Sequence, residues 1–525
     1  MDKKTLIAIV LSIAVLVGFQ YFMKDSTPPQ TPQKQEAAKA DEKAAAVKAV
    51  PGDTKAKKVP ETVKAVVAKT ITVENDVFKA ILSSKGASVR QVELKNYKDA
   101  KGNLIVLKGE EAQPALALGT DEGLQFAGAI FDVTGGDIKL DDKKKSADLV
   151  FEYKAGDVRI KRTFTFSKAD YSVAVRDEVR GPDSYLVSLG RNFGIHDREN
   201  ADHSGPILLK DTDRIALTGK DVKEAIKSYK DNVKWIAQED KYFAAFIVPK
   251  GSIEEARAWS KESDALIGLK MKSGDNSYLF YAGPKEYDIL EPYKTGMEHV
   301  IDFGFFSILA RPLFWFLKWI NGMVNNFGYS IIILTIVTRI PFIPLINKGQ
   351  RSMKKMSDMQ PRMAEIKEKY KNDPKRMQQE TMELYKKHKI NPVGGCLPML
   401  LQVPFFFALF SILSTAIELR HAPFILWITD LAGPDNLIGH MLGLPFVLGP
   451  LPLLMGATMF IQQKMTPSAG DPKQQKIMLL MPIIFTFMFL SFASGLVLFW
   501  LVNNVLSIIQ QFYINRQTAA AQQQQ

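Results

Sequence analysis

The chain has 525 residues, of which 46% are hydrophobic and 24% are charged, and its 68 Lys and Arg against 56 Asp and Glu give a net charge of +12. Apolar residues are sparse between residues 24 and 69 and nearly continuous between residues 397 and 515, which indicates a membrane protein with a soluble part. The single cysteine, Cys396, excludes an intramolecular disulfide and a metal site built from cysteines.

The N-terminal segment 1–23 combines a basic start, MDKK, with the apolar run Leu6 to Met23. This run is longer than the apolar core of a cleavable signal, and no small-x-small site precedes Lys24. It predicts an uncleaved transmembrane anchor whose N-terminus is cytoplasmic. Residues 24–69 contain no aromatic residue and cannot bury enough apolar surface to fold, so they are interpreted as a flexible linker outside the membrane.

Short alternating segments fill residues 70–300. The segment VRIKRTFTF places four apolar side chains on one face: Val158, Ile160, Phe164 and Phe166. Similar runs, such as TITVENDVFKAIL and NSYLFYAGP, are separated by Gly, Asp and Asn, and together they predict a large antiparallel β-sandwich. The polar stretch HDRENADH (196–203) has no metal-ligand spacing and is interpreted as a loop.

Residues 301–328 predict an amphipathic helix at the outer membrane surface. The apolar side chains recur at helical spacing, at Leu309, Leu313, Phe316, Ile320 and Val324. The opposite stripe carries Arg311, Lys318 and Asn325, and Trp315 and Trp319 suit the headgroup level. Packing of this helix against the β-sandwich is the alternative.

Five further transmembrane helices are predicted within residues 329–516. The spans are Tyr329 to Asn347, Leu397 to Ile417, Leu444 to Ile461, and two from Ile477 to Ile514. The last stretch has 38 residues, about 57 Å as one helix, and therefore has to fold back at SFASG (491–495). With the anchor this gives a six-span bundle, with both termini cytoplasmic and a short tail at 517–525.

The loop 348–390 is strongly basic, with thirteen Lys and Arg against six Asp and Glu between Lys348 and Lys389. A basic excess suits nucleic acid or a membrane surface, but this position directly after a span favours a cytoplasmic loop and no direct contact with nucleic acid. Asp373 and Pro374 suit a helix start, which predicts a helical hairpin. Its Met stripe, including Met353, Met356 and Met363, suits either a substrate surface or packing between the two arms.

Arg339 lies in the middle of the second span, about 14 Å from either end at helical rise. An arginine at this depth costs about 2.5 to 3.5 kcal/mol and by default marks a functional site. Since none of the other spans contains Asp or Glu, a water-filled cavity explains it best, with Thr335, Gln402 and Asn503 as polar neighbours. Hydrogen bonding to helix carbonyls as a purely structural device is the alternative. No nucleophile and base pair, phosphate loop or metal cluster occurs in this half, so an enzyme and a cofactor are not expected.

Several motifs of the membrane half closely resemble the YidC membrane protein insertase family. They are SIIILTIVTRIPFIPLINKGQRSMKKM (330–356), NPVGGCLPMLLQVPFFFALF (391–410), FIQQKMTP (460–467), DPKQQKIMLLMPIIFTFMF (471–489) and SGLVLFWLVNNVLSIIQQ (494–511). The preceding anchor, linker and β-domain are similar to the Gram-negative form of that family, whose periplasmic domain is a β-supersandwich; WIAQEDKYFAAFIVP (235–249) fits there too.

The resemblance implies a chaperone and insertase of the inner membrane that acts alone or with the Sec translocon. It places Arg339 in a hydrophilic groove lined by Thr335, Gln402 and Trp500, to which Asn503 is added from its position in the sixth span. The expected partners are nascent membrane proteins, membrane lipid, the Sec translocon and the ribosome. Because the C-terminus RQTAAAQQQQ lacks a basic tail, ribosomes would have to bind the basic cytoplasmic loops.

Two other functions compete with insertion. A small-anion transporter would also use a buried arginine, but transporters usually contain internal repeats with paired broken helices, and none is visible here. A tethered periplasmic domain that binds or converts sugars would lose its function if residues 70–300 were deleted, whereas an insertase would largely keep it.

Overall fold

The computed structural model describes residues 68–99, 101–109, 113–195, 203–262, 264–388, 397–465 and 472–523. The chain divides into two compact units, Met1–Lys64 and Ala65–Gln525, and all described residues belong to the second. The predicted anchor, nearly all of the predicted linker, and residues 196–202 of the polar stretch therefore lie outside the described residues.

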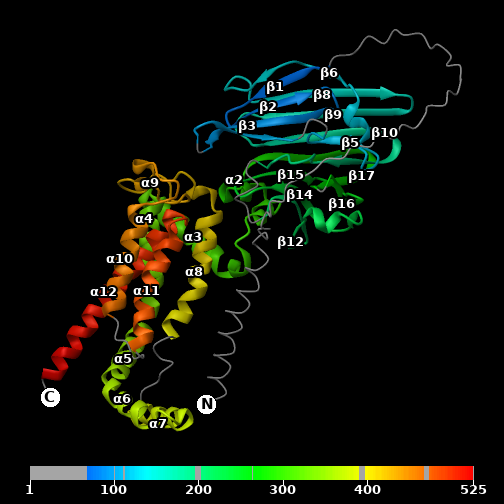
Figure 1. The fold of residues 1–525 in the computed structure, drawn as a ribbon. Helices are drawn as coiled ribbons and strands as arrows, with labels where there is room; N and C mark the ends of the chain where they lie inside the picture. The colour runs from blue at the N-terminus through cyan, green and yellow to red at the C-terminus, as the bar shows by residue number, and fades with distance from the viewer. Residues whose placement is uncertain are drawn as a thin grey trace, which may run out of the picture. The chain divides into compact units, whose positions relative to one another are not determined.

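The first half of the second unit is a β-domain of two sheets, which Figure 1 shows stacked on one another. The smaller sheet has the order β4 (Leu104–Lys108), β3 (Ser88–Lys98), β2 (Phe78–Ser83), β1 (Thr70–Glu74) and β7 (Ile138–Lys139). The main path of the larger sheet is β12 (Asp213–Ala216), β11 (Gly205–Lys210), β14 (Val233–Glu239), β15 (Phe243–Pro249), β17 (Asp264–Pro284), β10 (Ser172–Ser188), β9 (Val158–Ser167), β8 (Ser146–Ala155) and β6 (Asp132–Thr134). Beside it lie β5 (Ala117–Gly119), β13 (Lys227–Tyr229), β16 (Glu255–Lys261), η1 (Gln125–Gly128) and η2 (Gly219–Val222). All pairings are antiparallel except β1 with β7, so the predicted antiparallel sandwich is confirmed.

Alternation along β9 buries Ile160, Phe164 and Phe166 as predicted, but the same face also buries Arg162. Its guanidinium makes two hydrogen bonds of 2.7 Å to the carboxylate of Asp177 on β10. It also donates to the carbonyl oxygens of Ala87 and Leu116 at 3.1 and 2.5 Å. The buried charge is therefore paired and makes four hydrogen bonds, and it joins β9 to backbone segments at the smaller sheet.

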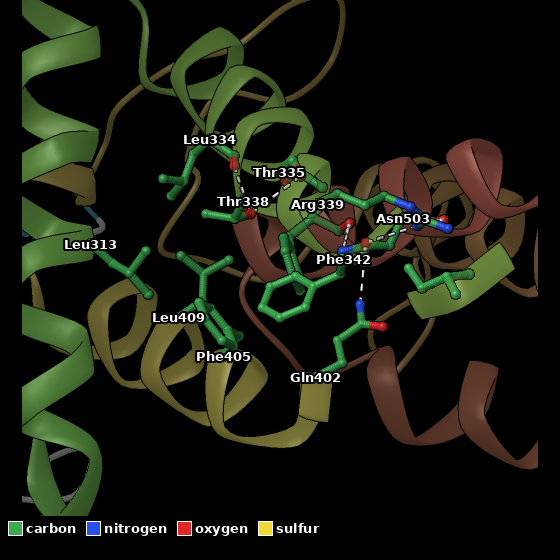
Figure 2. Close-up of a pocket in the computed structure, with 12 residues that line it drawn as sticks. Leu313, Leu334, Thr335, Thr338, Arg339, Phe342, Gln402, Phe405, Leu409 and Asn503 are labelled. Carbon is green, nitrogen blue, oxygen red and sulfur yellow. Dashed lines mark hydrogen bonds between the residues drawn. The ribbon is translucent and has the colours of Figure 1, made fainter. Parts of the chain in front are cut away.

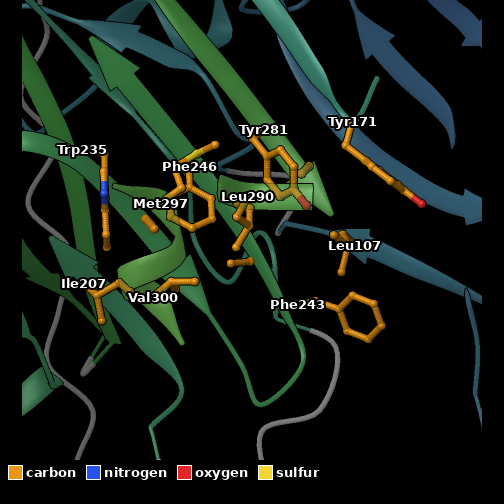
Figure 3. Packing of buried hydrophobic residues seen from close by; sticks show 14 of the residues in the cluster. Leu107, Tyr171, Ile207, Trp235, Phe243, Phe246, Tyr281, Leu290, Met297 and Val300 are labelled. Atoms are coloured by element: carbon orange, nitrogen blue, oxygen red, sulfur yellow. The ribbon is translucent and has the colours of Figure 1, made fainter. Parts of the chain in front are cut away.

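A connecting segment follows β17 and leads into helix α3. It contains α2 (Tyr287–Leu290), η3 (Glu291–Tyr293), η4 (Met297–Val300) and η5 (Gly304–Phe306), and α3 (Ser307–Val324) follows it. Leu290, Met297 and Val300 are fully buried, and Figure 3 shows them packed beside Trp235 and Phe246 of the β-domain. The connecting segment is thus anchored in the core of the β-domain.

Helix α3 is amphipathic, although its buried face differs from the predicted stripe. The buried side chains are Ala310, Phe314, Leu317 and Ile320, and they face α4 (Phe327–Arg339) and α8 (Leu397–Thr415). The predicted Leu309, Leu313 and Phe316 are only partly buried at the flank. The opposite face leaves Ile308, Trp315, Trp319 and Met323 exposed. Most of the buried face of α3 is therefore covered by other helices rather than by strands.

The membrane half is helical throughout its described residues, apart from loops and one isolated bridge. Its remaining elements are η6 (Ile340–Phe342), α5 (Ile343–Asp358), α6 (Gln360–Lys369), α7 (Pro374–Lys387), η8 (Ile417–Leu419), α9 (Leu437–Leu442), α10 (Pro450–Met465), α11 (Pro472–Phe489) and α12 (Ser494–Gln523). Within the described ranges, Phe327–Asp358 and Ser494–Gln517 are long and apolar enough to cross a membrane, and Gln402–Thr415 and Leu479–Phe489 are shorter apolar helices. The number of six spans stays a prediction.

The predicted fold-back near residue 493 is confirmed, because α11 ends at Phe489 and α12 begins at Ser494. The start of the fourth predicted span is wrong by six residues: the helix begins at Pro450 instead of Leu444. The carboxylate of Asp435 accepts a hydrogen bond of 2.8 Å from the backbone N–H of Leu451. This bond satisfies an orphan donor in the first turn of α10 and fixes its start after a loop.

The predicted helical hairpin is confirmed, with α6 and α7 as its arms and α5 leading into it. The side chain of Asp373 accepts a hydrogen bond of 3.0 Å from the backbone N–H of Arg376, and Pro374 is the first residue of α7. This is the arrangement predicted for the start of the second arm.

Candidate functional site

Arg339 is placed by the break between α4 and α5. In a continuous helix the N–H of residue 341 would donate to the carbonyl of Val337, but Pro341 has no N–H. Instead the N–H of Ile340 reaches the carbonyls of both Ile336 and Val337, and the short turn η6 separates the two helices. Arg339 is therefore the last residue of α4.

The guanidinium of Arg339 binds a row of neutral oxygens on α12. One nitrogen donates to the backbone oxygen of Asn503 at 2.9 Å and to its side-chain oxygen at 3.3 Å. The other donates to the hydroxyl of Ser507 at 2.8 Å and to the amide oxygen of Gln510 at 3.1 Å. Because residues 503, 507 and 510 are spaced by four and three, their side chains lie on one face of α12.

The polar contacts extend from α12 to two further helices. The amide nitrogen of Gln402 on α8 donates to the side-chain oxygen of Asn503 at 3.2 Å. The amide nitrogen of Gln510 donates to the side-chain oxygen of Asn347 on α5. Asn503 thus accepts from both Arg339 and Gln402, and the network joins α4, α5, α8 and α12.

A cavity lies between these helices, and Figure 2 shows Arg339, Gln402 and Asn503 at one side of it and apolar side chains at the other. The volume open to the centres of water molecules is about 40 Å³, which at about 10 to 15 Å³ per water holds roughly three. Its walls are Leu313, Leu334, Thr335, Thr338, Arg339, Phe342, Ile346, Gln402, Phe405, Leu409, Phe499 and Asn503. The cavity is large enough for water and too small for a peptide segment.

The charge of Arg339 is balanced by no carboxylate among the residues that the structure describes. Each neutral hydrogen bond contributes only modestly when it replaces a bond to water, although bonds to a charged group are stronger. The described part of the chain also contains no group of His, Cys, Asp and Glu that could hold a metal ion. The arrangement is therefore a partly buried cation at the meeting point of four helices, beside a cavity with room for water.

Four of the predicted groove residues come together at this cavity: Arg339, Thr335, Gln402 and Asn503. The hydroxyl of Thr335 is occupied by its own helix, because it donates to the carbonyl of Ile331 at 2.6 Å. Trp500 is not one of the lining residues, and its ring packs against those of Phe406, Phe485 and Phe489 instead.

Ser507, Gln510 and Thr338 also belong to this site and were not predicted from the sequence. The polar spacing on one face of α12 is a signal that would have found Ser507 and Gln510, because Asn503 was already singled out. Thr338 is adjacent to Arg339, and its hydroxyl donates to the carbonyl of Leu334 at 2.7 Å.

The three predicted methionines of the hairpin occupy two different settings. Met363 on α6 accepts a hydrogen bond of 3.0 Å at its sulfur from the hydroxyl of Tyr385 on α7, so it packs between the arms. Met353 and Met356 lie on α5 and are partly exposed.

Two family models match this chain. The model described as 60Kd inner membrane protein matches residues 319–522, and the model described as YidC periplasmic domain matches residues 70–316. The boundary between the two matches falls inside α3.

The chain is also similar to curated proteins along its whole length. It is 39% identical to the membrane protein insertase YidC of Pelobacter propionicus, covering 98% of this chain and 99% of the relative. It is also 39% identical to the membrane protein insertase YidC of Geotalea daltonii, and that match covers 99% of this chain and 100% of the relative.

Solved structures are less similar. A crystal structure of an active YidC insertase with its first transmembrane domain resolved covers 85% of this chain and 92% of its own, with 18% identity and a TM-score of 0.40. A galactose mutarotase related enzyme from Lactobacillus acidophilus covers 41% of this chain and 97% of its own, with 14% identity and a TM-score of 0.28.

Proposed function

Because this chain belongs to the YidC family of membrane protein insertases, we propose that it inserts its substrates through the cavity around Arg339. The chain is a membrane-integral, non-enzymatic insertase with a β-rich periplasmic domain and a helical membrane part. The proposal concerns the route that a substrate takes. The observation that carries it is a central arginine whose described partners are all neutral oxygens, beside a cavity with room for water.

The cation and its waters reduce the desolvation cost of a substrate's polar segment. An acidic side chain at mid-membrane depth costs about 2.5 to 3.5 kcal/mol, and a nearby guanidinium offsets part of that cost by Coulomb attraction. The apolar part of the substrate then moves into lipid, which contributes about 0.8 kcal/mol per buried methylene. Because the cavity holds only a few waters as it stands, the helices have to separate for a substrate to enter.

The same proposal gives the cytoplasmic hairpin an early contact with the substrate. The partly exposed Met353 and Met356 form a flexible, polarizable surface that suits apolar segments of different shape. Met363 joins this surface only when it leaves its contact with Tyr385.

The topology that goes with this route has six spans, both termini in the cytoplasm, and a location in a Gram-negative inner membrane. Nascent membrane proteins are the substrates, and the Sec translocon is a partner for some of them. Ribosomes bind the basic cytoplasmic loops, which is supported by the thirteen Lys and Arg between Lys348 and Lys389.

Replacing Arg339 tests the route. Arg339→Ala should reduce insertion of a single-span substrate with an acidic translocated tail at least tenfold, whereas Arg339→Lys should keep most of the activity because the positive charge remains. Insertion is measured in proteoliposomes as protection of the tail from protease. Arg351→Ala, which removes an exposed arginine of α5, is the matched control and should insert normally.

Two outcomes would contradict the proposed route. The first is equal activity of the alanine and lysine variants, because then the charge has no role. The second is an equal loss for a substrate with a neutral tail, because then Arg339 acts only on the structure of the bundle.

A further inference from the structure

A second cavity, with a volume of about 640 Å³, lies between the connecting segment after β17 and the helix α3. It shares no lining residue with the cavity at Arg339. Its wall contains charged side chains of both signs beside aromatic rings, namely Glu298, Arg311, Lys318, Tyr287, Trp315 and Trp319. Such a combination is typical of a ligand site rather than of a packing defect, which would be apolar.

Both walls of this cavity are firmly held. On one side Met297 and Val300 are buried in the core of the β-domain (Figure 3), and Trp235 donates a hydrogen bond of 3.1 Å to the carbonyl of Gly296. On the other side Phe314 and Leu317 bury one face of α3 against neighbouring helices. The cavity is therefore largely formed before a ligand arrives.

The charged groups of the cavity are not all paired with each other. Lys318 forms an ion pair with Asp288, so these two charges balance. Arg311, which is exposed, has no carboxylate partner among the described residues. One carboxylate oxygen of Glu298 is buried and has no hydrogen-bond partner among the described residues. The other oxygen lies 3.9 Å from the Nε2 atom of His299. The cavity therefore offers one cation and one anion to a ligand.

Two lining residues on α3, Trp315 and Trp319, are largely exposed, and so is Ile308 on the same helix. Ile308 is 90% exposed, Trp315 66% and Trp319 52%. Only Asn325 and Asn326 separate α3 from α4, the start of an apolar helix long enough to cross a membrane. Exposed tryptophans at the end of such a helix are typical of the level of lipid headgroups.

We propose that this cavity binds the headgroup of an aminophospholipid, with its phosphate at Arg311 and its primary ammonium at Glu298. The rings of Trp315 and Trp319 lie beside the glycerol and the upper acyl chains. The inference rests on the proposed position of α3 at the outer membrane surface and is independent of the route through Arg339.

The chemistry of the free groups favours this ligand over related ones. A phospholipid without an amine leaves the carboxylate of Glu298 unpaired and places a second negative charge near it. A quaternary ammonium has no N–H to donate to that carboxylate, so it leaves the buried oxygen without a hydrogen bond. A primary ammonium on a phosphodiester satisfies both ends of the cavity.

Native mass spectrometry of the full chain in detergent tests the proposal. Phosphatidylethanolamine should bind at least fivefold more tightly than phosphatidylcholine or phosphatidylglycerol. Glu298→Gln should remove this preference while phosphatidylglycerol binding stays the same or rises. Arg311→Gln, which changes an exposed side chain and leaves the fold intact, should weaken the binding of phosphatidylethanolamine and of phosphatidylglycerol by a similar factor.

The matched controls are Glu291→Gln and Lys294→Gln, which change neighbouring charges that do not line the cavity, and both should bind lipid like the unchanged chain. Soluble O-phosphoethanolamine and inorganic phosphate serve as competitors and should displace little lipid. Three outcomes would overturn the proposal: no preference among the three lipids, the same preference in Glu298→Gln, or complete displacement by a soluble competitor. Lipid binding is measured without substrate, so failure here and failure of the insertion route are distinguishable.

Discussion

Arg162 and Arg339 are both arginines in largely apolar surroundings, and their partners are different in kind. Arg162 is fully buried and paired with the carboxylate of Asp177, which also accepts a hydrogen bond of 3.0 Å from the hydroxyl of Tyr278. Arg339 is only partly buried, and its described partners are neutral. The charge of Arg162 is neutralised by its partner and has a structural role. The charge of Arg339 is not neutralised by any described partner.

The difference gives a prediction for the β-domain. Asp177→Ala leaves the guanidinium of Arg162 buried without its counter-charge, which should destabilise the domain by about 3 to 5 kcal/mol. Hydrogen exchange of the amides of β9 and β10 in the full chain measures this loss. The exposed pair of Arg176 and Asp275 joins the same strand β10 to β17, so Asp275→Ala is the control and should cost far less stability than Asp177→Ala. Similar losses in the two variants would refute the structural role of the buried pair.

The sequence predicted single residues better where one helix or strand decides their position. Alternation placed Ile160, Phe164 and Phe166 correctly, and helical rise placed Arg339 near the cavity. Arg162 was left out because a charge on a buried face contradicts the apolar pattern, and its partner Asp177 comes from another strand. Trp500 was assigned to the groove, but the rotation of α12 depends on packing between helices, which no single-helix pattern contains.

Whole elements were predicted well where chain length or turn chemistry is decisive. The long apolar run after Ile477 is too long for one span, and the structure indeed divides it into α11 and α12. The start of α10 was missed because the apolar loop before it, which includes Pro445 and Phe446, looks like part of a span. Only the capping contact of Asp435 with Leu451 distinguishes the loop from the helix.

The short element η8 carries the next prediction, because it holds Glu418 against α3. The side chain of Glu418 is 8% exposed, and Lys318 on α3 lies 3.9 Å from its carboxylate. Burial raises the pKa of Glu418 to about 7, although the positive charge of Lys318 acts in the opposite direction. The folded chain therefore holds this proton more tightly than the unfolded chain, whose ordinary pKa is 4.5.

Because the pKa is raised on folding, this group favours the folded state most at pH below 4.5 and progressively less as the pH rises to about 7. The stabilisation that Glu418 contributes to the folded state should therefore fall by on the order of 3 kcal/mol as the pH rises from 4.5 to about 7. Thermal unfolding of the full chain in detergent at pH 5 and pH 8 measures it. Glu418→Gln should remove this part of the pH dependence, and the exposed Glu383→Gln should not. An unchanged pH dependence in Glu418→Gln would show that the carboxyl is solvated.

At the scale of the whole molecule, α3 belongs with the membrane helices. Its buried face packs on α4 and α8, and the backbone oxygen of Phe303 just before it accepts a hydrogen bond of 2.8 Å from the hydroxyl of Ser411. Removing the strands alone leaves these contacts in place, whereas removing α3 uncovers apolar side chains such as Ile331 and Leu334.

Two deletions test this division. A chain without residues 70–284 should keep most of its insertion activity, whereas a chain without residues 70–320 should lose it and unfold at lower temperature. Insertion in proteoliposomes and thermal unfolding in detergent provide the two measurements. If the shorter deletion alone abolished insertion while the membrane part stayed folded, the β-domain would have to take part in transfer.

The hydrogen bonds of Arg339 to Asn503, Ser507 and Gln510 have a consequence for the energy source of the protein. Every acceptor is a carbonyl, a hydroxyl or an amide, and a polypeptide backbone presents carbonyls of equal strength at each residue. On the proposed route, we expect an arriving chain to replace α12 one acceptor at a time, with little net change in free energy. If substrates take the proposed route, we therefore expect insertion to need no nucleotide hydrolysis.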